Sequence, residues 1–308
     1  MTTRLLHRPA EAAALLRAGG TVAFPTETVY GLGADAFAPE AIAAVFRAKG
    51  RPPDNPLIVH LAAPEAAGRV ARRTPLGDRL LAAFAPGPIT VVLPSRGVLP
   101  PAVTAGLGTV AVRVPSHPDA RGLLRKAGPL VAPSANRSGR PSPTAWEAVR
   151  DDLGGRISGI LVGEVSALGL ESTVVDATGG APVVLRPGGV SLEALRAVEP
   201  LARLATPTDA AERSPGTRHR HYAPLATVRV VARGDAPAPE ALFLGLDAPL
   251  AGYGHTVLYP SPEAYARGLY AALREADARG MARVDAQAVP EAGIGRALMD
   301  RLRRAAAR

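Results

Sequence analysis

The sequence of 308 residues contains no cysteine, which excludes disulfide bonds, thiolate zinc sites and a cysteine nucleophile. Aromatic residues make up 4% of the chain, so the stacking platforms that bind single-stranded nucleic acid are scarce. No run of 18 or more apolar residues occurs, and residues 1–9 lack the apolar stretch of a signal peptide. These absences predict a cytoplasmic protein without membrane-spanning helices.

Lysine is also rare, because only Lys49 and Lys126 stand among 36 basic residues. The net charge of +9 is spread along the chain, which favours a compositional bias over a dedicated nucleic-acid surface, although a basic surface also steers anionic ligands such as ATP or tRNA. Lys49 and Arg51 stand together before a proline-rich loop. The compact ammonium charge of a lysine beside the planar guanidinium group of an arginine suits a polyphosphate. A cationic helix end that complements the helix dipole is the alternative.

The hydrophobic pattern divides the chain into three parts. Residues 1–200 alternate short apolar strands with helices, and the same alternation resumes from residue 226. Between them, residues 201–225 lose this period and contain several prolines. We therefore predict a catalytic α/β domain over residues 1–200, a linker over 201–225 and a small α/β domain over 226–308.

Residues 20–61 predict a strand–loop–helix–loop–strand unit. Thr21–Phe24 and Leu57–Leu61 have the composition of strands, and each is flanked by polar residues. Between them, Pro39 suits a first helical turn and Gly50 suits a helix end. Open α/β sheets bind their ligands where such strands end, so we expect the chemistry there.

Several standard catalytic sites are absent from the sequence. The chain has no Walker A sequence, no complete dinucleotide-binding glycine pattern, no HExxH and no GxSxG. His219 and His221 lack the second cluster that a metal site needs. What remains is a series of polar loops at strand ends without an obvious nucleophile. This composition fits phosphoryl or nucleotidyl transfer, in which positioning and charge stabilisation supply most of the catalysis.

Arg113 lies on the apolar strand Thr109–Val114, where an unpaired charge is costly. It is either one half of a core ion pair or a fork for a ligand carboxylate, and we favour the fork. Ser134, Asn136 and Ser142 stand in a proline-rich loop after another strand. They offer hydroxyl and amide groups to a ligand, although turn chemistry is the ordinary explanation for such residues.

Seven segments combine these features: PTETVYGLG (Pro25–Gly33), KGRPPDNPLIVH (Lys49–His60), TVAVRVPSHP (Thr109–Pro118), APSANRSGRPSPT (Ala132–Thr144), LESTVVD (Leu170–Asp176), LRPGG (Leu185–Gly189) and SPGTRHRHYAP (Ser214–Pro224). In this order they resemble the motifs of the threonylcarbamoyl-AMP synthase family, in its longer two-domain form. The segments span nearly all of the first domain and the linker. The second domain resembles the family mainly by position and size.

The resemblance implies a nucleotidyltransferase that joins L-threonine, bicarbonate and ATP into L-threonylcarbamoyladenylate and releases pyrophosphate. This is the first step of the threonylcarbamoyladenosine modification of tRNA, which a separate transferase complex completes. The implied cofactor is Mg²⁺, held mainly by the ATP phosphates without ligands from the protein, and a weak direct contact with tRNA is a further expectation. The implied fold is a twisted, open, mixed α/β sheet of the YrdC type with a large, positively charged cavity, followed by a smaller Rossmann-like α/β domain.

The resemblance also assigns site residues, position by position. Lys49 and Arg51 take the catalytic role of neutralising phosphate charge as it develops. The ATP-contacting set consists of Lys49, Arg51, Asn55, Thr109, Ser134, Asn136, Ser142, Arg186 and Tyr222. The threonine-contacting set consists of Thr28, His60, Arg113, Ala132 and Ser172.

The linker segment Ser214–Pro224 is unusually rich in functional side chains. It carries two histidines, two arginines and a tyrosine within eleven residues. We expect it to close over the mouth of the site as a lid, with Pro215 and Gly216 as the hinge and Tyr222 on the nucleotide, so that a water-labile acyl-adenylate is shielded. A mobile tether between the domains is the alternative.

Two other functions stay open at this point. A related domain forms a carbamoyl adenylate in hydrogenase maturation, but the proteins that contain it also carry zinc-finger cysteines, which are absent here. An RNA-binding or ribosome-associated protein would use the same basic cavity. The separated Lys49, Arg113 and Arg186, each beside small hydroxyl residues, suit a small-molecule pocket better. Pyrophosphate release that requires both threonine and bicarbonate separates the three functions.

Overall fold

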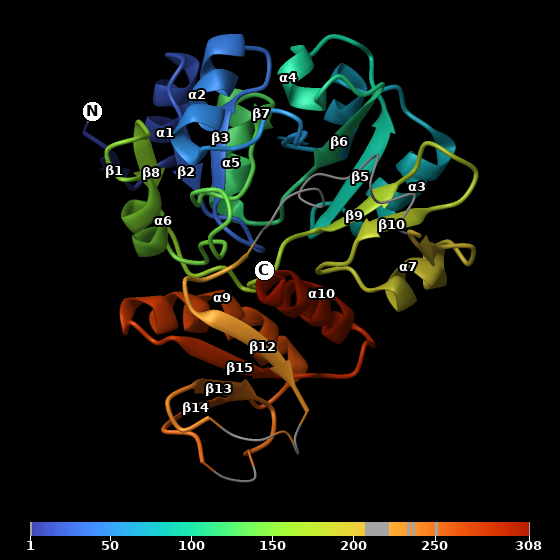
Figure 1. Cartoon of the computed structure of the whole chain (residues 1–308). Helices are drawn as coiled ribbons and strands as arrows, with labels where there is room; N and C mark the ends of the chain where they lie inside the picture. The colour runs from blue at the N-terminus through green and yellow to red at the C-terminus, as the bar shows by residue number, and fades with distance from the viewer. Residues whose placement is uncertain (1, 207–221, 233–234, 236–237, 250–251, 308) are drawn as a thin grey trace.

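In the computed structural model, which describes residues 2–206, 222–232, 235, 238–249 and 252–307, the chain forms two α/β units (Figure 1). We call residues 2–206 the large unit and residues 222–307 the small unit. The twisted mixed sheet of the first and the smaller parallel sheet of the second agree with the predicted fold class.

The strands of the large unit are β1 (Arg4–Leu6), β2 (Val22–Phe24), β3 (Gly31–Asp35), β4 (Ile58–His60), β5 (Ile89–Pro94), β6 (Thr109–Arg113), β7 (Leu130–Val131), β8 (Gly159–Leu161), β9 (Thr173–Asp176), β10 (Val183–Arg186) and β11 (Arg203–Leu204). They form one sheet in the order β1-β8-β2-β3-β7-β4-β6-β5-β9-β10-β11. Its helices are α1 (Pro9–Arg17), α2 (Pro39–Lys49), α3 (Pro75–Phe84), α4 (Pro101–Thr104), α5 (Pro118–Ala127), α6 (Trp146–Leu153) and α7 (Leu192–Val198), with a 3₁₀ helix, η1 (Pro64–Arg69).

Helix α2 begins and ends where the sequence predicts. Pro39 occupies its first turn, and Gly50 follows it with a left-handed φ of 62°. Ile42 and Val45 lie at helical spacing on its buried face. These local signals place Lys49 at the last position of the helix, next to the loop that leads to β4.

The predicted strand–loop–helix–loop–strand unit was wrong in one respect, because β3 lies between β2 and α2. The chain turns back after Phe24 and pairs β3 with β2 in antiparallel register, Val22 opposite Gly33. Two glycines give β3 a weak strand signal. Gly33 is required there, since a Cβ atom at this position would stand 2.9 Å from the ring of Phe24. As a result, β3 and β7 separate β2 from β4.

The small unit contains a parallel sheet of β12 (Thr227–Val231), β13 (Leu242–Gly245), β14 (His255–Leu258) and β15 (Arg283–Gln287) in the order β12-β15-β13-β14. Helices α9 (Pro262–Ala278) and α10 (Ile294–Ala306) lie between this sheet and the large unit (Figure 1). The apolar cluster that they form with the sheet also includes Val29 and Leu170 of the large unit. The two units therefore share part of one core.

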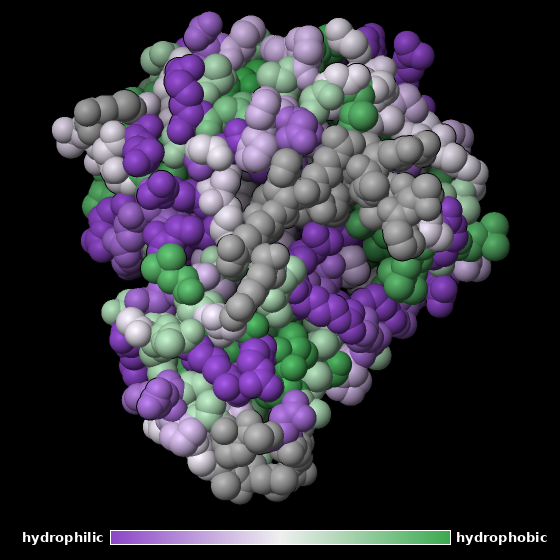
Figure 2. All heavy atoms as spheres, in the orientation of Figure 1, coloured by the Kyte–Doolittle hydropathy of each residue, from purple (hydrophilic) through white to green (hydrophobic). Residues whose placement is uncertain are grey.

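The predicted linker, 201–225, begins with β11, which pairs in parallel with β10. Residues 207–221 lie outside the described residues, and so does most of the segment that we expect to act as a lid. Within the described part of the chain, no helix has both the length and the apolar character needed to cross a membrane. On the face seen in Figure 2, hydrophilic side chains cover much of both units, and apolar side chains lie in small groups among them.

Candidate active site

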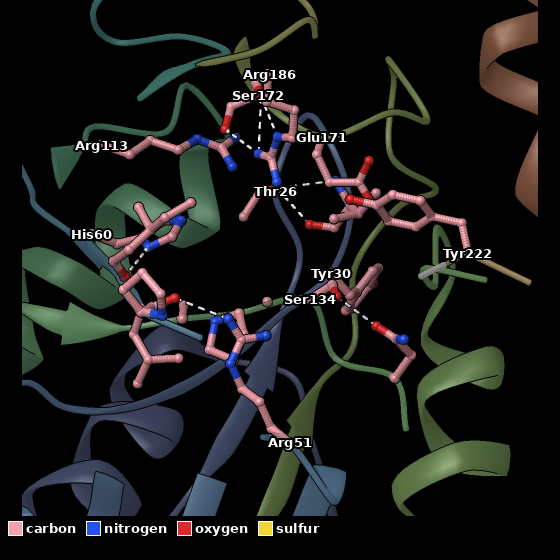
Figure 3. A pocket seen from close by; sticks show the side chains of 18 residues that line it. Thr26, Tyr30, Arg51, His60, Arg113, Ser134, Glu171, Ser172, Arg186 and Tyr222 are labelled. Carbon is pink, nitrogen blue, oxygen red and sulfur yellow. Dashed lines mark hydrogen bonds between the residues drawn. The ribbon is translucent and has the colours of Figure 1, made fainter. Parts of the chain in front are cut away.

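A pocket opens where several strands of the large sheet end (Figure 3). The space between its lining atoms amounts to about 660 Å³, a figure that includes open solvent at its mouth. Its charged lining residues are three arginines and one glutamate. The lining consists of Thr26, Val29, Tyr30, Gly31, Arg51, Pro56, Leu57, Ile58, His60, Arg113, Ala132, Pro133, Ser134, Asn136, Glu171, Ser172, Arg186 and Tyr222.

His60 and Arg113 stand side by side at one edge of this pocket. They are the last residues of β4 and β6, which run parallel and pair His60 with Arg113 in register. Both side chains are buried. Polar groups therefore meet at the carboxyl ends of parallel strands, as the sequence predicts.

Arg113 forms an ion pair with Glu27 in the loop after β2. The Nη2 atom of Arg113 lies 2.9 Å from Oε1 of Glu27, and Oε2 of Glu27 accepts a hydrogen bond from the backbone N–H of Ser116 at 3.2 Å. The Nη2–Oε1 contact is an ion pair without the geometry of a hydrogen bond, and Nε of Arg113 makes no hydrogen bond to any described residue. The core ion pair is therefore present, and the guanidinium keeps donors for a second carboxylate, so the fork stays a prediction.

His60 is neutral in this environment. Burial lowers its pKa, the charge of Arg113 lowers it further, and the resulting pKa is about 3. Its Nδ1 atom lies 3.2 Å from the carbonyl oxygen of Ile58. Because a carbonyl only accepts hydrogen bonds, we assign the ring proton to Nδ1, which leaves Nε2 as an acceptor.

Arg186 and Ser172 lie near Arg113 in the pocket lining (Figure 3). Nε and Nη2 of Arg186 donate to the carbonyl oxygen of Ser172 at 3.2 and 2.9 Å, and Nη2 also reaches the Ser172 hydroxyl at 3.2 Å. Burial is the main cause that lowers the pKa of Arg186 from its usual value. The next turn needs Gly188, since a Cβ atom there would stand 2.3 Å from the backbone of Ser172 and Thr173.

Arg51 and Lys49 reach the site in different ways. Arg51 lines the pocket, and its Nε and Nη2 atoms donate to the carbonyl oxygens of Asn55 and Pro56 at 3.2 and 2.9 Å. Lys49 is buried behind the lining, where Nζ donates to the carbonyl oxygens of Ser134 and Asn136 at 2.5 and 2.6 Å. Burial, and then the charge of Arg51, hold the pKa of Lys49 well below its usual value.

The loop after β7 is held by its own side chains as well as by Lys49. The Ser134 hydroxyl donates to Oδ1 of Asn136 at 2.5 Å, and Nδ2 of Asn136 donates to the carbonyl oxygens of Arg137 and Arg140 at 2.8 and 2.9 Å. The Ser142 hydroxyl donates to Oε1 of Glu171 at 2.6 Å. Turn chemistry is therefore real here, and it fixes a loop whose Ser134 and Asn136 face the pocket.

Tyr222 begins the described part of the chain after the gap at 207–221. It is buried, has a φ of 67° and lines the pocket. Its ring centroid lies 5.3 Å from Cζ of Arg301 and 5.6 Å from the ring centroid of Tyr270. Tyr222 and both of these neighbours belong to the small unit, so Tyr222 is a contribution of the small unit to a pocket lined mostly by the large unit.

The structure brings most of the predicted site residues together. Those that line the pocket are Arg51, His60, Arg113, Ala132, Ser134, Asn136, Ser172, Arg186 and Tyr222. The others lie outside the lining, namely Thr28, Lys49, Asn55, Thr109 and Ser142. Thr28 lies beside the lining, where its hydroxyl is 2.9 Å from the hydroxyl of Thr26. Thr109 lines a separate small cleft with Thr104 and Leu107.

Sequence reasoning missed two carboxylates of the site. Glu27 pairs with Arg113, and Glu171 lines the pocket. The signal was present, because each glutamate stands beside hydroxyl residues at a strand end. It also missed Tyr270 and Arg301, whose side chains contact Glu171 from the small unit.

Both units of the chain match models of known protein families. A family model described as "Telomere recombination" matches residues 14–188. A second model, described as "Threonylcarbamoyl-AMP synthase, C-terminal domain", matches residues 190–307. Together the two models cover nearly the whole chain.

Individual relatives match over similar lengths. Threonylcarbamoyl-AMP synthases of Pyrococcus abyssi and Bacillus subtilis are 42% and 41% identical, each over 96% of this chain and 92% of the relative. The crystal structure of P. abyssi Sua5 complexed with L-threonine matches with a TM-score of 0.90 and 38% identity, over 99% of this chain and 98% of that one. E. coli YciO matches 61% of this chain and 96% of its own, with a TM-score of 0.55 and 24% identity, which speaks for the fold of the large unit alone.

Proposed function

The chain belongs to the threonylcarbamoyl-AMP synthase family, whose members are nucleotidyltransferase-type enzymes, and we propose that it makes L-threonylcarbamoyladenylate from L-threonine, bicarbonate and ATP. The amine of threonine and bicarbonate first form the carbamate with loss of water. A carbamate oxygen then attacks the α-phosphorus of ATP, the bond to the β-phosphate oxygen breaks, and pyrophosphate leaves. Substrate supplies the nucleophile, which agrees with a pocket lined by cations and small polar groups.

The observation that carries the proposal is the pairing of Arg113 with His60 at the ends of β4 and β6. Beside its ion pair with Glu27, Arg113 keeps the Nε donor, which makes no hydrogen bond to a described residue, for the carboxylate of an amino acid. Neutral His60 has an acceptor, Nε2, for a side-chain hydroxyl. One residue recognises what all amino acids share and the other recognises a hydroxyl, which together fit threonine. The threonine-bound relative supports the same ligand.

The cations elsewhere in the pocket suit the triphosphate. Arg51 and Arg186 enter the lining from different walls (Figure 3). Two guanidinium groups neutralise phosphate charge without a proton transfer, because arginine stays charged at neutral pH. Ser134 and Asn136 also line the pocket and offer polar groups for the rest of the nucleotide.

ATP enters this proposal as its Mg²⁺ complex. Among the described residues, no group of three or more His, Asp or Glu side chains is arranged to hold a metal ion. The carboxylate in the pocket lining, Glu171, already accepts hydrogen bonds from Ser142, Tyr270 and Arg301. The metal is therefore proposed as part of the substrate, held by the phosphates, and no step depends on a protein ligand to it.

The adenylate is a mixed anhydride that water hydrolyses, so it needs an acceptor close at hand. We propose that a tRNA threonylcarbamoyl transferase complex in the cytoplasm consumes it, with any direct contact between this chain and tRNA being weak. The predicted lid, segment Ser214–Pro224 of the linker, belongs to the same proposal, since it would shield the product until transfer.

Pyrophosphate release should require ATP, L-threonine and bicarbonate together. The reason is that the nucleophile forms only when the amino acid and bicarbonate are both bound. The measurement is a coupled pyrophosphate assay with bicarbonate-depleted buffer and single omissions, followed by mass detection of the adenylate. Equal pyrophosphate release with threonine omitted contradicts the proposed function.

L-Serine should be a poorer substrate than L-threonine by a modest factor. Both share the carboxylate and hydroxyl that Arg113 and His60 recognise, and they differ by one methyl group. One such group changes kcat/KM by roughly 10- to 200-fold. The measurement is competition between the two amino acids at saturating ATP, and equal kcat/KM values would show that the pocket does not contact the methyl group.

A further inference from the structure

An ion pair from the small unit ends in the wall of the pocket. Nε of Arg301 in α10 donates to Oε2 of Glu171 at 2.7 Å. Arg301 has an exposed fraction of 0% and Glu171 of 6%, so both charges are removed from water. Glu171 lines the pocket directly before Ser172. The proposed reaction assigns no role to either charge.

The carboxylate of Glu171 accepts hydrogen bonds from both units. The Tyr270 hydroxyl of α9 donates to Oε2 at 2.9 Å and lies 3.2 Å from Oε1. The Ser142 hydroxyl of the large unit donates to Oε1 at 2.6 Å. A buried carboxylate needs such saturation, because each missing partner leaves a desolvated lone pair. Removing the small unit's donors would leave Oε2 of Glu171 without the hydrogen bonds from Tyr270 and Arg301.

Arg301 also holds neighbouring parts of the site. Its Nη2 atom donates to the carbonyl oxygen of Pro187 at 3.0 Å, in the turn that follows Arg186. Its guanidinium lies over the ring of Tyr222. One side chain therefore contacts the glutamate, the turn after Arg186 and the tyrosine.

The charge state of Glu171 agrees with this geometry. Burial by itself raises its pKa, but the charges of Arg301 and Arg186, with hydrogen bonds from Ser142 and Arg301, hold it at about 2. The other titratable groups that face it are the Tyr270 and Tyr222 hydroxyls, and burial raises the pKa of both. Glu171 is thus a carboxylate and both phenols are neutral at any pH near neutrality.

We propose that Arg301 and Tyr270 of the small unit are positioning residues of the active site, which fix Glu171 and through it Ser172 and Arg186 in the pocket wall. This inference rests on the proposed function for its kinetic readout. The small unit would then complete the site that the large unit carries. Its helices α9 and α10 supply these contacts, while its sheet lies behind them (Figure 1).

A simpler role, in which these residues only dock the two units, predicts a different result. Arg296 of α10 offers a matched control, because its Nη2 atom pairs with Oε1 of Glu193 of the large unit at 3.0 Å. This pair also joins the units, but Glu193 is half exposed and neither residue lines the pocket. Arg296→Ala removes a docking contact without touching Glu171.

The kinetic test compares Arg301→Gln with Arg296→Ala in the full chain. We expect Arg301→Gln to lower kcat/KM for ATP about 100-fold, because small displacements of positioning groups have effects of that size. Arg296→Ala should stay near the unmodified protein. Tyr270→Phe, which keeps the ring and removes the hydroxyl, should lower kcat/KM about tenfold through the lost hydrogen bond to a charged acceptor. Circular dichroism and urea unfolding check that each variant is folded.

The pH dependence separates positioning from docking. In the unmodified protein Glu171 stays ionised far below neutral pH. Its protonation therefore causes no loss of activity on the acid side of the pH profile within the assay range. Without Arg301, burial raises its pKa, the carboxyl group protonates as the pH falls, and activity is lost on the acid side and recovers as the pH rises. ¹³C NMR of the Glu171 carboxyl carbon, assigned with Glu171→Gln, follows the same pKa without using activity.

The outcomes are distinct. If the unmodified protein releases no pyrophosphate with all three substrates, the proposed function fails. The NMR titration then still tests whether Arg301 keeps the pKa of Glu171 low. An Arg301→Gln variant with the kinetics, pH profile and Glu171 signal of the Arg296→Ala control overturns the positioning role. If Arg301→Gln does not fold, Tyr270→Phe decides, and unchanged kinetics in that variant overturn the inference.

Discussion

Replacing Arg113 by alanine is expected to raise the KM for L-threonine roughly 10- to 100-fold, with a much smaller change in kcat, since hydrogen bonds between charged groups contribute about 1.5–3 kcal/mol. The threonine carboxylate is present in the ground state and in the transition state alike, so losing its partner weakens both equally. Initial rates at varied threonine and saturating ATP and bicarbonate measure the effect. Arg113→Lys should recover only part of the loss, because lysine keeps the charge but not the planar fork.

The same substitution tests the ion pair with Glu27. Arg113→Ala leaves a buried carboxylate without its partner, so the free energy of unfolding should fall by about 3–5 kcal/mol. Glu27→Gln is the companion variant, because it breaks the pair and keeps the guanidinium. It should lose stability without a higher KM for threonine. If both variants lose stability and neither changes that KM in the folded protein, Arg113 is a core ion pair and not a ligand fork.

Replacing Lys49 by methionine, which nearly preserves its volume, should lower kcat about 100-fold, the size expected when one group that stabilises transition-state charge is removed. Two features of the structure motivate this change. The ammonium group is buried beside Arg51, and it holds the carbonyl oxygens of Ser134 and Asn136. Single-turnover release of pyrophosphate at saturating ATP measures it, because that step contains the chemistry.

Lys49 has an alternative role, support of the loop after β7, and the same kinetic measurement distinguishes this role from catalysis. Its hydrogen bonds go to the loop and not into the pocket, so its loss also loosens Ser134 and Asn136. A higher KM for ATP with an unchanged kcat contradicts the catalytic role and assigns Lys49 to the support of that loop. Lys126, an exposed lysine in the last turn of α5, provides the matched control through Lys126→Met, which should leave both constants unchanged.

Local sequence signals were sufficient for most of the secondary structure. Pro39 and Gly50 bound α2, and Ser191 caps α7 with its side chain. Proline, glycine and capping serine act on the few residues around them, so the helix ends that they set can be predicted from the sequence alone. Strand β3 was missed because its two glycines weaken the strand signal. The reason for these glycines is the neighbouring ring of Phe24, which only the folded sheet brings close.

The residue types of the site could also be predicted from the sequence. Which of these residues contact each other could not be predicted. The motifs pointed to Arg113, His60 and Arg186 as functional, because charged and polar groups at strand ends are costly without a ligand or partner. The sequence did not say that Glu27 would neutralise Arg113, or that Lys49 would lie behind the lining. Those facts depend on strand order, which places β6 beside β4 and lets distant loops meet.

What the sequence by itself determined is an α/β protein without thiols, a nucleophile motif or a metal cluster motif, and it predicted anion-binding chemistry for that protein. What only the tertiary structure decided is which charges face each other. Arg301 stands 130 residues after Glu171, on a helix whose amphipathic pattern predicts burial of its apolar face and says nothing about a buried arginine. Coulomb interactions depend on distance in space and on exclusion of water, and packing of the small unit against the large unit sets both.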